Sequence, residues 1–386
     1  MRNVPLSTDL AAPAPGRRSG PLAGVRIIEM AAIGPVPFAA MLLADMGADI
    51  VKIDRPQPTP GASVINRGRQ TVRVDLKAEA GRETAASLIA SADIVLEGFR
   101  PGVMERLGLG PEAMLARNPA LVFGRMTGWG QDGPLAHVAG HDINYIAVTG
   151  ALAAIGARGA APPPPLNLIG DYGGGALYLA MGVLAALHSA RQTGRGQVVD
   201  AAICEGALSL MSVFYQFHSQ GEWRLDRESN IVDGGAPFYG VFECADGGCV
   251  SVAPMEPQFW ALFKARLELD ESWDTRDDPA AWPALVERLR ALFRTRAQAD
   301  WCALLEGTDV CFAPVLDMAE APAHPQLAAR GAFAAFEGMT VPGPAPRFSA
   351  TPAAMSAPEQ IEDAGAILAR WTEHRAPDTL QARTSR

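Results

Sequence analysis

Apolar and polar positions follow two periods along the first half of the chain. Short apolar runs of the buried-strand type occupy residues 25–30 (VRIIEM), 49–54 (DIVKID), 71–76, 93–97 and 121–126. Segments with helical spacing lie between them, at residues 38–46, 81–90, 101–107 and 111–117. Strands that alternate with helices in this way predict an open, mainly parallel α/β sheet that is covered on both faces.

The same pattern indicates where a ligand site belongs. In open parallel sheets, ligands bind at the carboxyl ends of the strands. We therefore expect the site near the loops that follow residues 30, 54, 76 and 97. The first of these loops lacks a GxGxxG sequence, so the usual dinucleotide fingerprint is absent.

The second half of the chain predicts a smaller α+β domain. A long apolar helix at 176–188 is followed by a strand at 197–201 and a helix at 205–217. Residues 237–254 alternate as strands around a turn, and helical patterns follow at 257–267, 282–294, 297–305 and 357–373. We divide the chain into a flexible tail (1–20), a large domain (21–220), a linker (221–236), a small α+β domain (237–324) and a C-terminal return to the large domain (325–386).

Length and composition narrow the class of protein. A chain of 386 residues exceeds the usual size of one hydrophobic core, which favours more than one domain. With 48% hydrophobic and 19% charged residues the chain is of the folded globular type, and a net charge of −9 argues against a general nucleic-acid binder. Five cysteines without paired spacing indicate neither a zinc site nor a disulfide framework and suit a cytoplasmic location. Because polar residues and glycines interrupt the apolar helix patterns, we predict no membrane span.

The stretch from residue 140 to 175 carries the clearest candidate chemistry. It contains His141 after a glycine, and Asp171 before three glycines and the long apolar helix. We expect Asp171 to be the N-cap of that helix, with the free N–H groups of the first turn available to an oxyanion. A neutral base, a carboxyl group and an oxyanion site together suit proton abstraction next to a carbonyl group. The alternative is that His141 is structural and Asp171 is only a helix cap.

Several further residues are candidates for ligand contacts. Basic side chains follow predicted strands at Arg55, Lys77, Arg100 and Arg106, a pattern that favours a phosphorylated ligand, although each residue alone also suits a solvated surface. Ile33 and Phe99 suit either core packing or the cover of a base or pantetheine chain. Glu256 is either a solvated first-turn acid or the partner that fixes the tautomer of His141.

Long motifs, in order along the chain, resemble one enzyme family. They are RPGVMERLGLGP at 100–111, MTGWGQDGP at 126–134, GHDINY at 140–145, PLNLIGDYGGG at 165–175, GRGQVVDAA at 194–202, DGGAPFYGVFECADG at 233–247 and EPQF at 256–259. Over residues 20–349 the chain resembles the α-methylacyl-CoA racemases of the class III CoA-transferase (CaiB/BaiF) superfamily. It departs from their pattern at Tyr172, where phenylalanine is usual, and at Gln70, where a second basic residue is common.

The resemblance implies an activity and a set of site residues. Such enzymes interconvert the R and S forms of 2-methylacyl-CoA thioesters through an enolate, without a metal or redox cofactor. It makes His141 and Asp171 the two bases on opposite faces of C2, and Glu256 the acid that pairs with the histidine. The implied CoA contacts are Ile33, Arg55, Val74, Asp75, Leu76, Lys77, Gly98, Phe99, Arg100, Arg106, Gly140, Asp142, Ile143, Asn144 and Tyr145.

The resemblance also implies an assembly. The expected fold is a homodimer of two chains interlocked as rings, each with a Rossmann-like large domain and a small domain. The expected site lies between the large domain of one chain and the small domain of its partner.

Two other functions stay open at this point. In the transferase branch of the superfamily, the aspartate at position 171 forms an acyl anhydride and then a CoA thioester, but the histidine of GHD is usually missing. A non-catalytic acyl-CoA-binding protein would use the same pocket. The acyl chain is also open among branched fatty acyl, sterol side-chain and arylpropionyl thioesters.

Overall fold

The computed structural model describes residues 19–373, and the chain forms two compact units. Among the described residues, the first unit comprises residues 19–146, Leu166–Ser209 and residues 331–373, and the second comprises Ala147–Pro165 and Leu210–Arg330. The predicted tail lies outside the described residues up to residue 18, and so does the end of the chain after residue 373. The domain boundaries proposed from the sequence stay a prediction.

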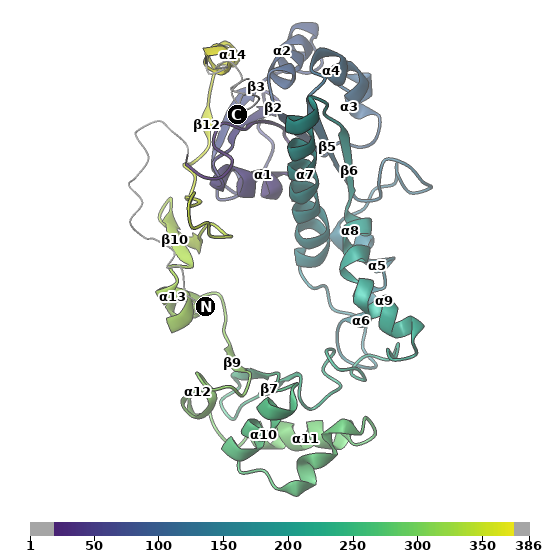
Figure 1. The fold of residues 1–386 in the computed structure, drawn as a ribbon, viewed down its shortest axis with the longest axis vertical. Helices are drawn as coiled ribbons and strands as arrows, with labels where there is room; N and C mark the ends of the chain where they lie inside the picture. Colours follow the sequence, from purple (N-terminus) through teal and green to yellow (C-terminus); the bar gives the residue numbers. More distant parts are fainter. Residues whose placement is uncertain (1–18, 374–386) are drawn as a thin grey trace, which may run out of the picture. The chain divides into compact units, whose positions relative to one another are not determined.

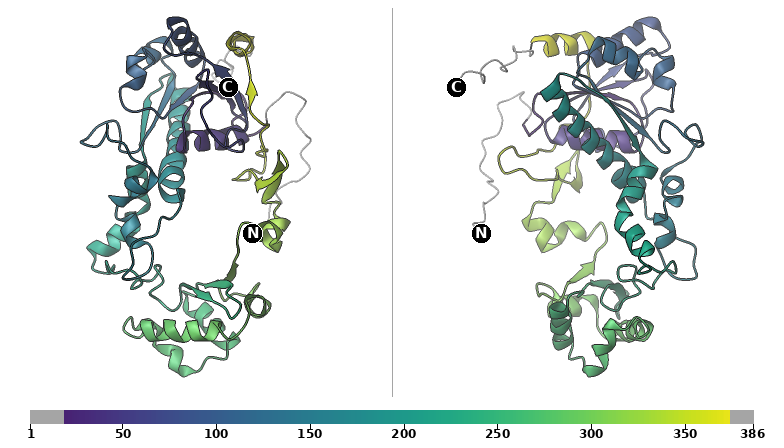
Figure 2. Two further views of the ribbon diagram at one scale, coloured as in Figure 1. Left: turned by 180° about the vertical axis from the view of Figure 1, so that it is seen from behind. Right: turned by 45° about the vertical axis from the view of Figure 1, so that its right-hand side comes forward.

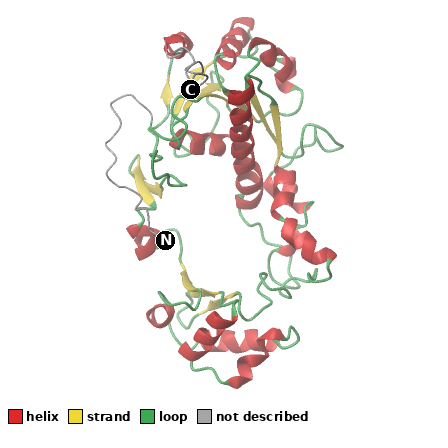
Figure 3. Ribbon diagram, in the orientation of Figure 1, coloured by secondary structure: helices red, strands yellow, loops and turns green. Residues whose placement is uncertain are grey.

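A seven-stranded parallel sheet forms the centre of the first unit (Figure 3). Its strands are β1 (Arg26–Met30), β2 (Asp49–Asp54), β3 (Arg69–Arg73), β4 (Ile94–Glu97), β5 (Val122–Thr127), β6 (Val198–Ala202) and β12 (Gln360–Ile361). Their order is β12-β3-β2-β1-β4-β5-β6, and every neighbouring pair is parallel. Apart from β12, this is the strand order of the doubly wound fold, whose connections reverse direction between β1 and β4.

Helices cover both faces of this sheet (Figures 1 and 2). One face packs against α1 (Pro35–Asp45) and α7 (Leu177–Thr193), through Val36, Leu43, Leu179 and Val183 among others. The other face packs against α2 (Glu79–Ala90), α3 (Val103–Arg106), α4 (Pro111–Arg117) and α14 (Ala364–Glu373). Strands β1, β2, β4 and β5 are buried on both sides, which explains why they read as continuous apolar runs, whereas β6 and β12 carry exposed residues.

The alternation of strands and helices is confirmed, and β2 and α4 have the predicted bounds. Other predicted bounds differ from the observed ones by a few residues, and three predictions need correction. β3 begins and ends earlier than predicted, because Arg69 and Thr71 pair with β2 while Val74 packs into the core beyond the strand. The helix predicted at 205–217 is two helices, α8 (Ile203–Leu210) and α9 (Ser212–Ser219). The helix predicted at 357–373 is β12 followed by α14.

The second unit contains a small antiparallel sheet with helices around it. β7 (Gly240–Glu243), β8 (Cys249–Val252) and β9 (Phe312–Val315) pair in that order. Helices α10 (Pro257–Arg266), α11 (Trp282–Phe293) and α12 (Gln298–Leu305) pack against this sheet. The hydrophobic core between the helices and the sheet contains four buried tryptophans. This confirms the predicted α+β character of this part of the chain.

The remaining elements are short. They are α5 (Asp142–Ala147), α6 (Ala151–Ala154), a π-helix (Leu168–Ala176), two 3₁₀ helices (Glu271–Asp277 and Ala321–Ala323), α13 (Pro325–Ala329), and the antiparallel pair β10 (Phe333–Phe336) and β11 (Met339–Pro342).

Among residues 19–373, one helical run is long and apolar enough to cross a membrane by length and composition. It joins the π-helix to α7 over Leu168–Thr193, with a mean hydropathy of 1.3 in its most apolar window. Half of that window is buried, and α7 packs along β5 and β6 as a core helix does (Figure 1).

Candidate active site

A cavity of about 560 Å³ opens where the connections of the parallel sheet reverse. It lies at the carboxyl ends of β1, β2, β4 and β5, and its walls include Ala31–Gly34, Asp54–Arg55, Gly98–Phe99 and Met126–Gly128. The reversal of strand order leaves a crevice at this edge, because the loops after β1 and β4 leave toward opposite faces. The position of the cavity therefore follows from the topology of the sheet.

His141 and Asp171 both line this cavity. His141 is exposed and directly precedes α5. Its carbonyl oxygen accepts a hydrogen bond of 2.8 Å from the main-chain N–H of Asn144, and its own N–H donates to Asn144 Oδ1 at 3.0 Å. Asn144 therefore closes the first turn of α5 around the histidine main chain.

Asp171 is not the N-cap of the following helix, so that prediction was wrong. The helix begins three residues earlier, as a π-helix whose N-cap is Asn167. The N–H of Tyr172 donates to the carbonyl oxygen of Asn167 at 3.2 Å, five residues back, and is thus used within the helix. Free N–H groups at a helix start after Asp171 are consequently not available to an oxyanion.

The glycines after Asp171 have a packing role that accounts for the misassignment. A Cβ atom on Gly174 would lie 2.5 Å from the main-chain N of Ala207, and one on Gly206 would lie 1.8 Å from the carbonyl oxygen of Gly174. The π-helix and α8 thus approach each other backbone to backbone, which only glycine permits.

Burial is the largest influence on the Asp171 carboxyl group, and it raises the pKa of Asp171. The amide of Asn167, whose Nδ2 donates to Asp171 Oδ2 at 3.5 Å, lowers this pKa, as does the charge of His141. The negative charge of Asp142 raises it. With a net upward shift of the pKa, the protonated form of Asp171 is favoured relative to an ordinary aspartate.

Tyr145 fixes the loop that carries His141. The Tyr145 ring lies close to two glycines. A Cβ atom on Gly128 would lie 2.0 Å from this ring, and a Cβ atom on Gly140 would lie 2.8 Å from it. The ring also packs edge-on against Trp129, with 4.9 Å between centroids, and its hydroxyl donates to the carbonyl oxygen of Gly140. Burial raises the pKa of Tyr145, and the nearby charge of Asp171 raises it further.

The structure brings some of the predicted CoA contacts to the cavity and leaves others outside it. The residues that line the cavity are Ile33, Arg55, Leu76, Gly98, Phe99, Gly140 and Tyr145. The residues that do not line it are Val74, Asp75, Lys77, Arg100, Arg106, Asp142, Ile143 and Asn144. Val74 belongs to the core below the sheet, and Asp142 is buried. The remaining basic side chains, Lys77, Arg100 and Arg106, are exposed.

Several lining residues were missed from the sequence, among them Gly34, Thr59, Gly128 and Ile203. The loop after β5 follows a strand end, as the loops after residues 30, 54, 76 and 97 do, so its position was a usable signal for Gly128. Thr59 lies in the loop after β2, where the site was expected, but nothing in this proline-rich loop singled out that residue.

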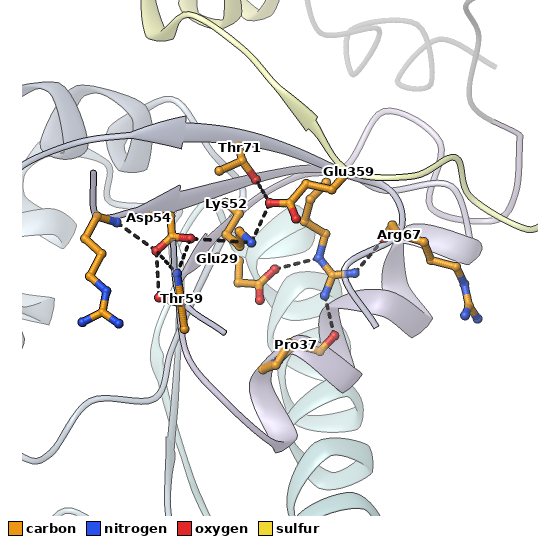
Figure 4. Close-up of polar contacts among 10 residues, drawn as sticks. Glu29, Pro37, Lys52, Asp54, Thr59, Arg67, Thr71 and Glu359 are labelled. Carbon is orange, nitrogen blue, oxygen red and sulfur yellow. Dashed lines mark hydrogen bonds and ion pairs between the residues drawn. The ribbon is translucent and has the colours of Figure 1, made fainter. Parts of the chain in front are cut away.

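Asp54 holds that loop in place (Figure 4). Its buried carboxylate accepts hydrogen bonds from the N–H of Arg55 at 2.9 Å, the N–H of Thr59 at 3.1 Å and the Thr59 hydroxyl at 2.7 Å. Arg55 and Thr59, which both line the cavity, are therefore positioned by one carboxylate at the end of β2.

A row of charged side chains extends from Asp54 across the sheet (Figure 4). The ammonium group of buried Lys52 lies 2.6 Å from Glu359 Oε1 and 3.8 Å from Asp54 Oδ2. Arg69 of β3 and Glu29 of β1 belong to the strands on either side of β2. Arg69 Nε donates to Glu29 Oε2 at 2.8 Å, with both side chains fully buried. Such charges are rare inside a parallel sheet and persist only when paired.

A second cavity of about 260 Å³ shares Asp171 and the loop Ala31–Gly34 with the first. Its other walls include Lys52, Asn66, Asn167 and Tyr172. The ring of Tyr172 stacks on Phe38 of α1 with 4.2 Å between centroids, so the tyrosine that departs from the family pattern packs between the two helices. The carboxyl group of Asp171 thus belongs to the walls of two adjacent spaces.

Glu256 lies in the second unit, where it is exposed at the N-cap position of α10. Its pairing with His141 stays a prediction. Within residues 19–373, no group of three or more His, Cys, Asp or Glu side chains is arranged to hold a metal ion.

Comparison with known proteins places these residues in a family context. The model of CoA-transferase family III matches residues 22–360. The chain is 42% identical to α-methylacyl-CoA racemase of Mus musculus over 338 residues, which cover 87% of this chain and 88% of the relative. It is 40% identical to the Homo sapiens enzyme of the same name over 337 residues, covering 86% and 87%.

More distant relatives include transferases. The acetyl-CoA:oxalate CoA-transferase of Acetobacter aceti is 29% identical over 390 residues, covering 94% of this chain and 98% of the relative. Among solved structures, a CAIB/BAIF family protein from Brucella suis superposes with a TM-score of 0.79 at 26% identity, covering 92% of this chain and 100% of that one.

Proposed function

The chain belongs to CoA-transferase family III, and on that premise we propose that it epimerises the C2 centre of 2-methylacyl-CoA thioesters. The identity of 40–42% to two α-methylacyl-CoA racemases supports this activity over the others found in the family. The substrate is an acyl-CoA, and the reaction as proposed uses no metal or redox cofactor.

One observation carries the proposal: a histidine and a carboxyl group with a raised pKa line the same cavity. A transferase needs the aspartate as its nucleophile, whereas removal of a proton from one face of C2 and delivery to the other needs two groups. His141 supplies the second group here.

The proposed reaction removes one proton from C2 and adds one proton to the opposite face of C2. For a 2S substrate, neutral His141 takes the C2 proton, and the electron pair passes into the thioester carbonyl as an enolate. Protonated Asp171 then delivers its proton to the opposite face of C2, which gives the 2R product. For a 2R substrate the roles reverse, so each direction leaves the pair ready for the other.

The raised pKa of Asp171 supports this cycle, because the reaction needs a carboxyl group that holds a proton in one state and releases it in the next. An ordinary exposed aspartate would be ionised at neutral pH and would be a poor proton donor. A positioned acid or base of this kind contributes about 10² to 10⁴-fold in rate.

Deuterium exchange tests the two roles separately. Each epimer of a 2-methylacyl-CoA is incubated in deuterated water, and label at C2 and chirality are followed together. The His141→Ala protein should not exchange the 2S epimer, while Asp171 still exchanges the 2R epimer with retention of configuration. The Asp171→Ala protein should show the converse. Inversion should fall by about 10² to 10⁴-fold in both, with thioester binding retained.

His137→Ala and Asp132→Ala are the controls, because both residues are exposed, follow β5 and do not line the cavity. Inversion by His141→Ala at the wild-type rate would contradict the two-base assignment. Thioester binding by the wild-type protein without any exchange at C2 would instead indicate a non-catalytic binding protein.

CoA transfer is the second candidate, favoured by the relatives that are transferases and by the position of Asp171 in the same cavity. The Asp171 carboxylate would attack the thioester carbonyl, form an anhydride and release the CoA thiolate. Transfer predicts that a labelled carboxylic acid enters the thioester pool and that hydroxylamine traps the intermediate. The racemase proposal predicts neither.

We also propose that the chain acts as an interlocked homodimer whose partner supplies Glu256 to His141. The resemblance to the racemases motivates this assembly. Co-expression of His141→Ala and Glu256→Ala chains with different tags gives mixed dimers for the test. If Glu256 comes from the partner, one of the two sites in a mixed dimer is intact, and activity returns to about half of the wild-type level. If each site uses its own chain, the mixed dimer stays as inactive as its parents.

A further inference from the structure

We propose that Asp142 is a positioning residue that joins the segments carrying the two bases and helps Asp171 to hold its proton. This inference rests on the two-base function proposed above. Asp142 does not line the cavity, and the CoA contact expected for it from the family resemblance stays a prediction.

The geometry places Asp142 between the two segments. Its carboxylate Oδ1 accepts a hydrogen bond of 2.6 Å from the main-chain N–H of Asp171. Asp142 is only 8% exposed, so this bond is protected from water, and hydrogen bonds to a charged acceptor are the stronger kind. Because Asp142 follows His141 directly, one side chain ties the histidine loop to the π-helix.

The hydrogen bond from Asp171 to Asp142 requires a glycine at position 170 of the π-helix. A Cβ atom on Gly170 would lie 2.2 Å from Asp142 Oδ1 and 3.1 Å from Ile146. Only a glycine at position 170 therefore lets the carboxylate reach the N–H of Asp171. Within the described residues, the bond connects two segments that are 29 positions apart in sequence and belong to different helices.

The charge of Asp142 acts on the same carboxyl group. The titratable groups that interact most with the Asp171 carboxyl are His141, and Asp142 and Tyr145 of α5. The cationic side chains of Arg55 and Lys52 and the phenol of Tyr172 line the two cavities that Asp171 also lines. On the side of α1 the neighbour is Gly34, where a Cβ atom would lie 3.2 Å from Asp171 Oδ2, and α1 presents no ionisable residue before Asp45. After burial, which is the largest influence, the negative charge of Asp142 also opposes ionisation of Asp171.

Two substitutions separate the positional role from the electrostatic role. Asp142→Asn keeps an oxygen that accepts the Asp171 N–H but removes the charge, whereas Asp142→Ala removes both. Asp93→Asn is the matched control. The Asp93 carboxylate also accepts a main-chain N–H, that of Arg26 at 2.7 Å, but lies at the amino ends of the strands, away from the cavity.

We expect Asp142→Ala to epimerise about tenfold to a hundredfold more slowly than wild type, because small displacements of reacting groups cost that much. The epimerisation rate of Asp142→Asn, measured at the pH optimum of this variant, should stay within about threefold of the wild-type rate, because the hydrogen bond is retained. In Asp142→Asn the pH profile of kcat/KM should move to lower pH, since loss of the negative charge makes Asp171 easier to ionise. Asp93→Asn should match wild type in rate and profile.

A readout independent of epimerisation distinguishes failure of this inference from failure of the proposed function. Water-soluble carbodiimides modify protonated carboxyl groups, so the pH dependence of Asp171 modification, read by peptide mass spectrometry, reports its protonation directly. The midpoint should lie at lower pH in Asp142→Asn than in wild type, whatever reaction the protein catalyses. An unchanged midpoint in Asp142→Asn overturns the electrostatic role, and wild-type epimerisation by Asp142→Ala overturns the positional role.

Discussion

At the scale of single residues, sequence patterns singled out His141 and Asp171 but not the residues that surround them. His141 and Asp171 stood out because a histidine after glycine and an acid before a glycine run are unusual, and the structure brings both to one cavity. The roles of Asp142 and Tyr145 depend on contacts with Asp171, Gly128 and Gly140 that no spacing in the sequence reveals.

The raised pKa of Asp171 predicts a particular pH profile. The active pair holds one proton in either direction of the reaction, so kcat/KM should follow one bell-shaped curve for both epimers. Activity falls at low pH when the pair takes up a second proton. Because burial raises the pKa of Asp171, this acid limb should lie clearly above the ordinary aspartate value of about 3.9.

Initial rates of inversion for each epimer, measured between pH 4 and pH 9, check this profile. Different curves for the two epimers are not compatible with the proposed exchange of roles, since no proton is released overall. An acid limb near the ordinary aspartate value would show that burial does not shift this carboxyl group.

At the scale of elements, hydrophobic periodicity located most strands and helices but misread the start of the helix at Asp171. A glycine run normally weakens a helix, so the pattern favoured a helix start after the run. Close backbone contact between the π-helix and α8 overrides this preference, because it depends on residues 174 and 206 lacking side chains. The two-residue strand β12 is shorter than any period that a sequence pattern can display.

Gly206→Ala tests this helix contact. The new Cβ atom would lie 1.8 Å from the carbonyl oxygen of Gly174, so one helix must shift. We expect the free energy of unfolding to fall by at least about 1–3 kcal/mol, the usual cost of overpacking, as measured by urea denaturation.

Gly365→Ala is the control for helix propensity. Gly365 lies in α14, where the added atom would meet only the side-chain oxygen of Asp363 at 3.0 Å. This variant should be neutral or more stable by up to about 1 kcal/mol. Equal stabilities of the two variants would show that the π-helix and α8 tolerate separation.

At the scale of the whole molecule, the alternation of elements was enough to predict a parallel sheet but not its seventh strand. The sheet is assembled from segments that are far apart in the sequence, since β12 joins β3 after the chain has built the second unit. The ion pair between Lys52 and Glu359 holds the segment before β12 against the sheet, and the Thr71 hydroxyl also donates to Glu359.

Loss of this ion pair should weaken the first unit. Glu359→Gln leaves the Lys52 ammonium buried with only Asp54 nearby at 3.8 Å. Since the Glu359 side chain is 30% exposed, we expect a loss of about 1–3 kcal/mol in the free energy of unfolding, below the range for fully buried pairs. Urea denaturation measures the change.

Lys52→Met combined with Glu359→Gln should recover part of that loss. The unpartnered ammonium group is then gone, and the Asp54 carboxylate keeps its hydrogen bonds from Arg55 and Thr59. The control is the exposed ion pair Arg117–Glu83, whose distance of 2.8 Å is similar to that between Lys52 and Glu359. Breaking this exposed pair should change the free energy of unfolding little. Strict additivity of the two substitutions would indicate that the residues do not interact.

The place of β12 in the sheet has a consequence for synthesis on the ribosome. The strand that completes one edge of the sheet is translated after all the others, more than 150 residues behind β6. Until Glu359 and β12 emerge, Lys52 lacks its nearest counter-charge and the edge of β3 has no neighbour. The nascent chain must therefore keep this edge from pairing with other strands while the second unit is being made.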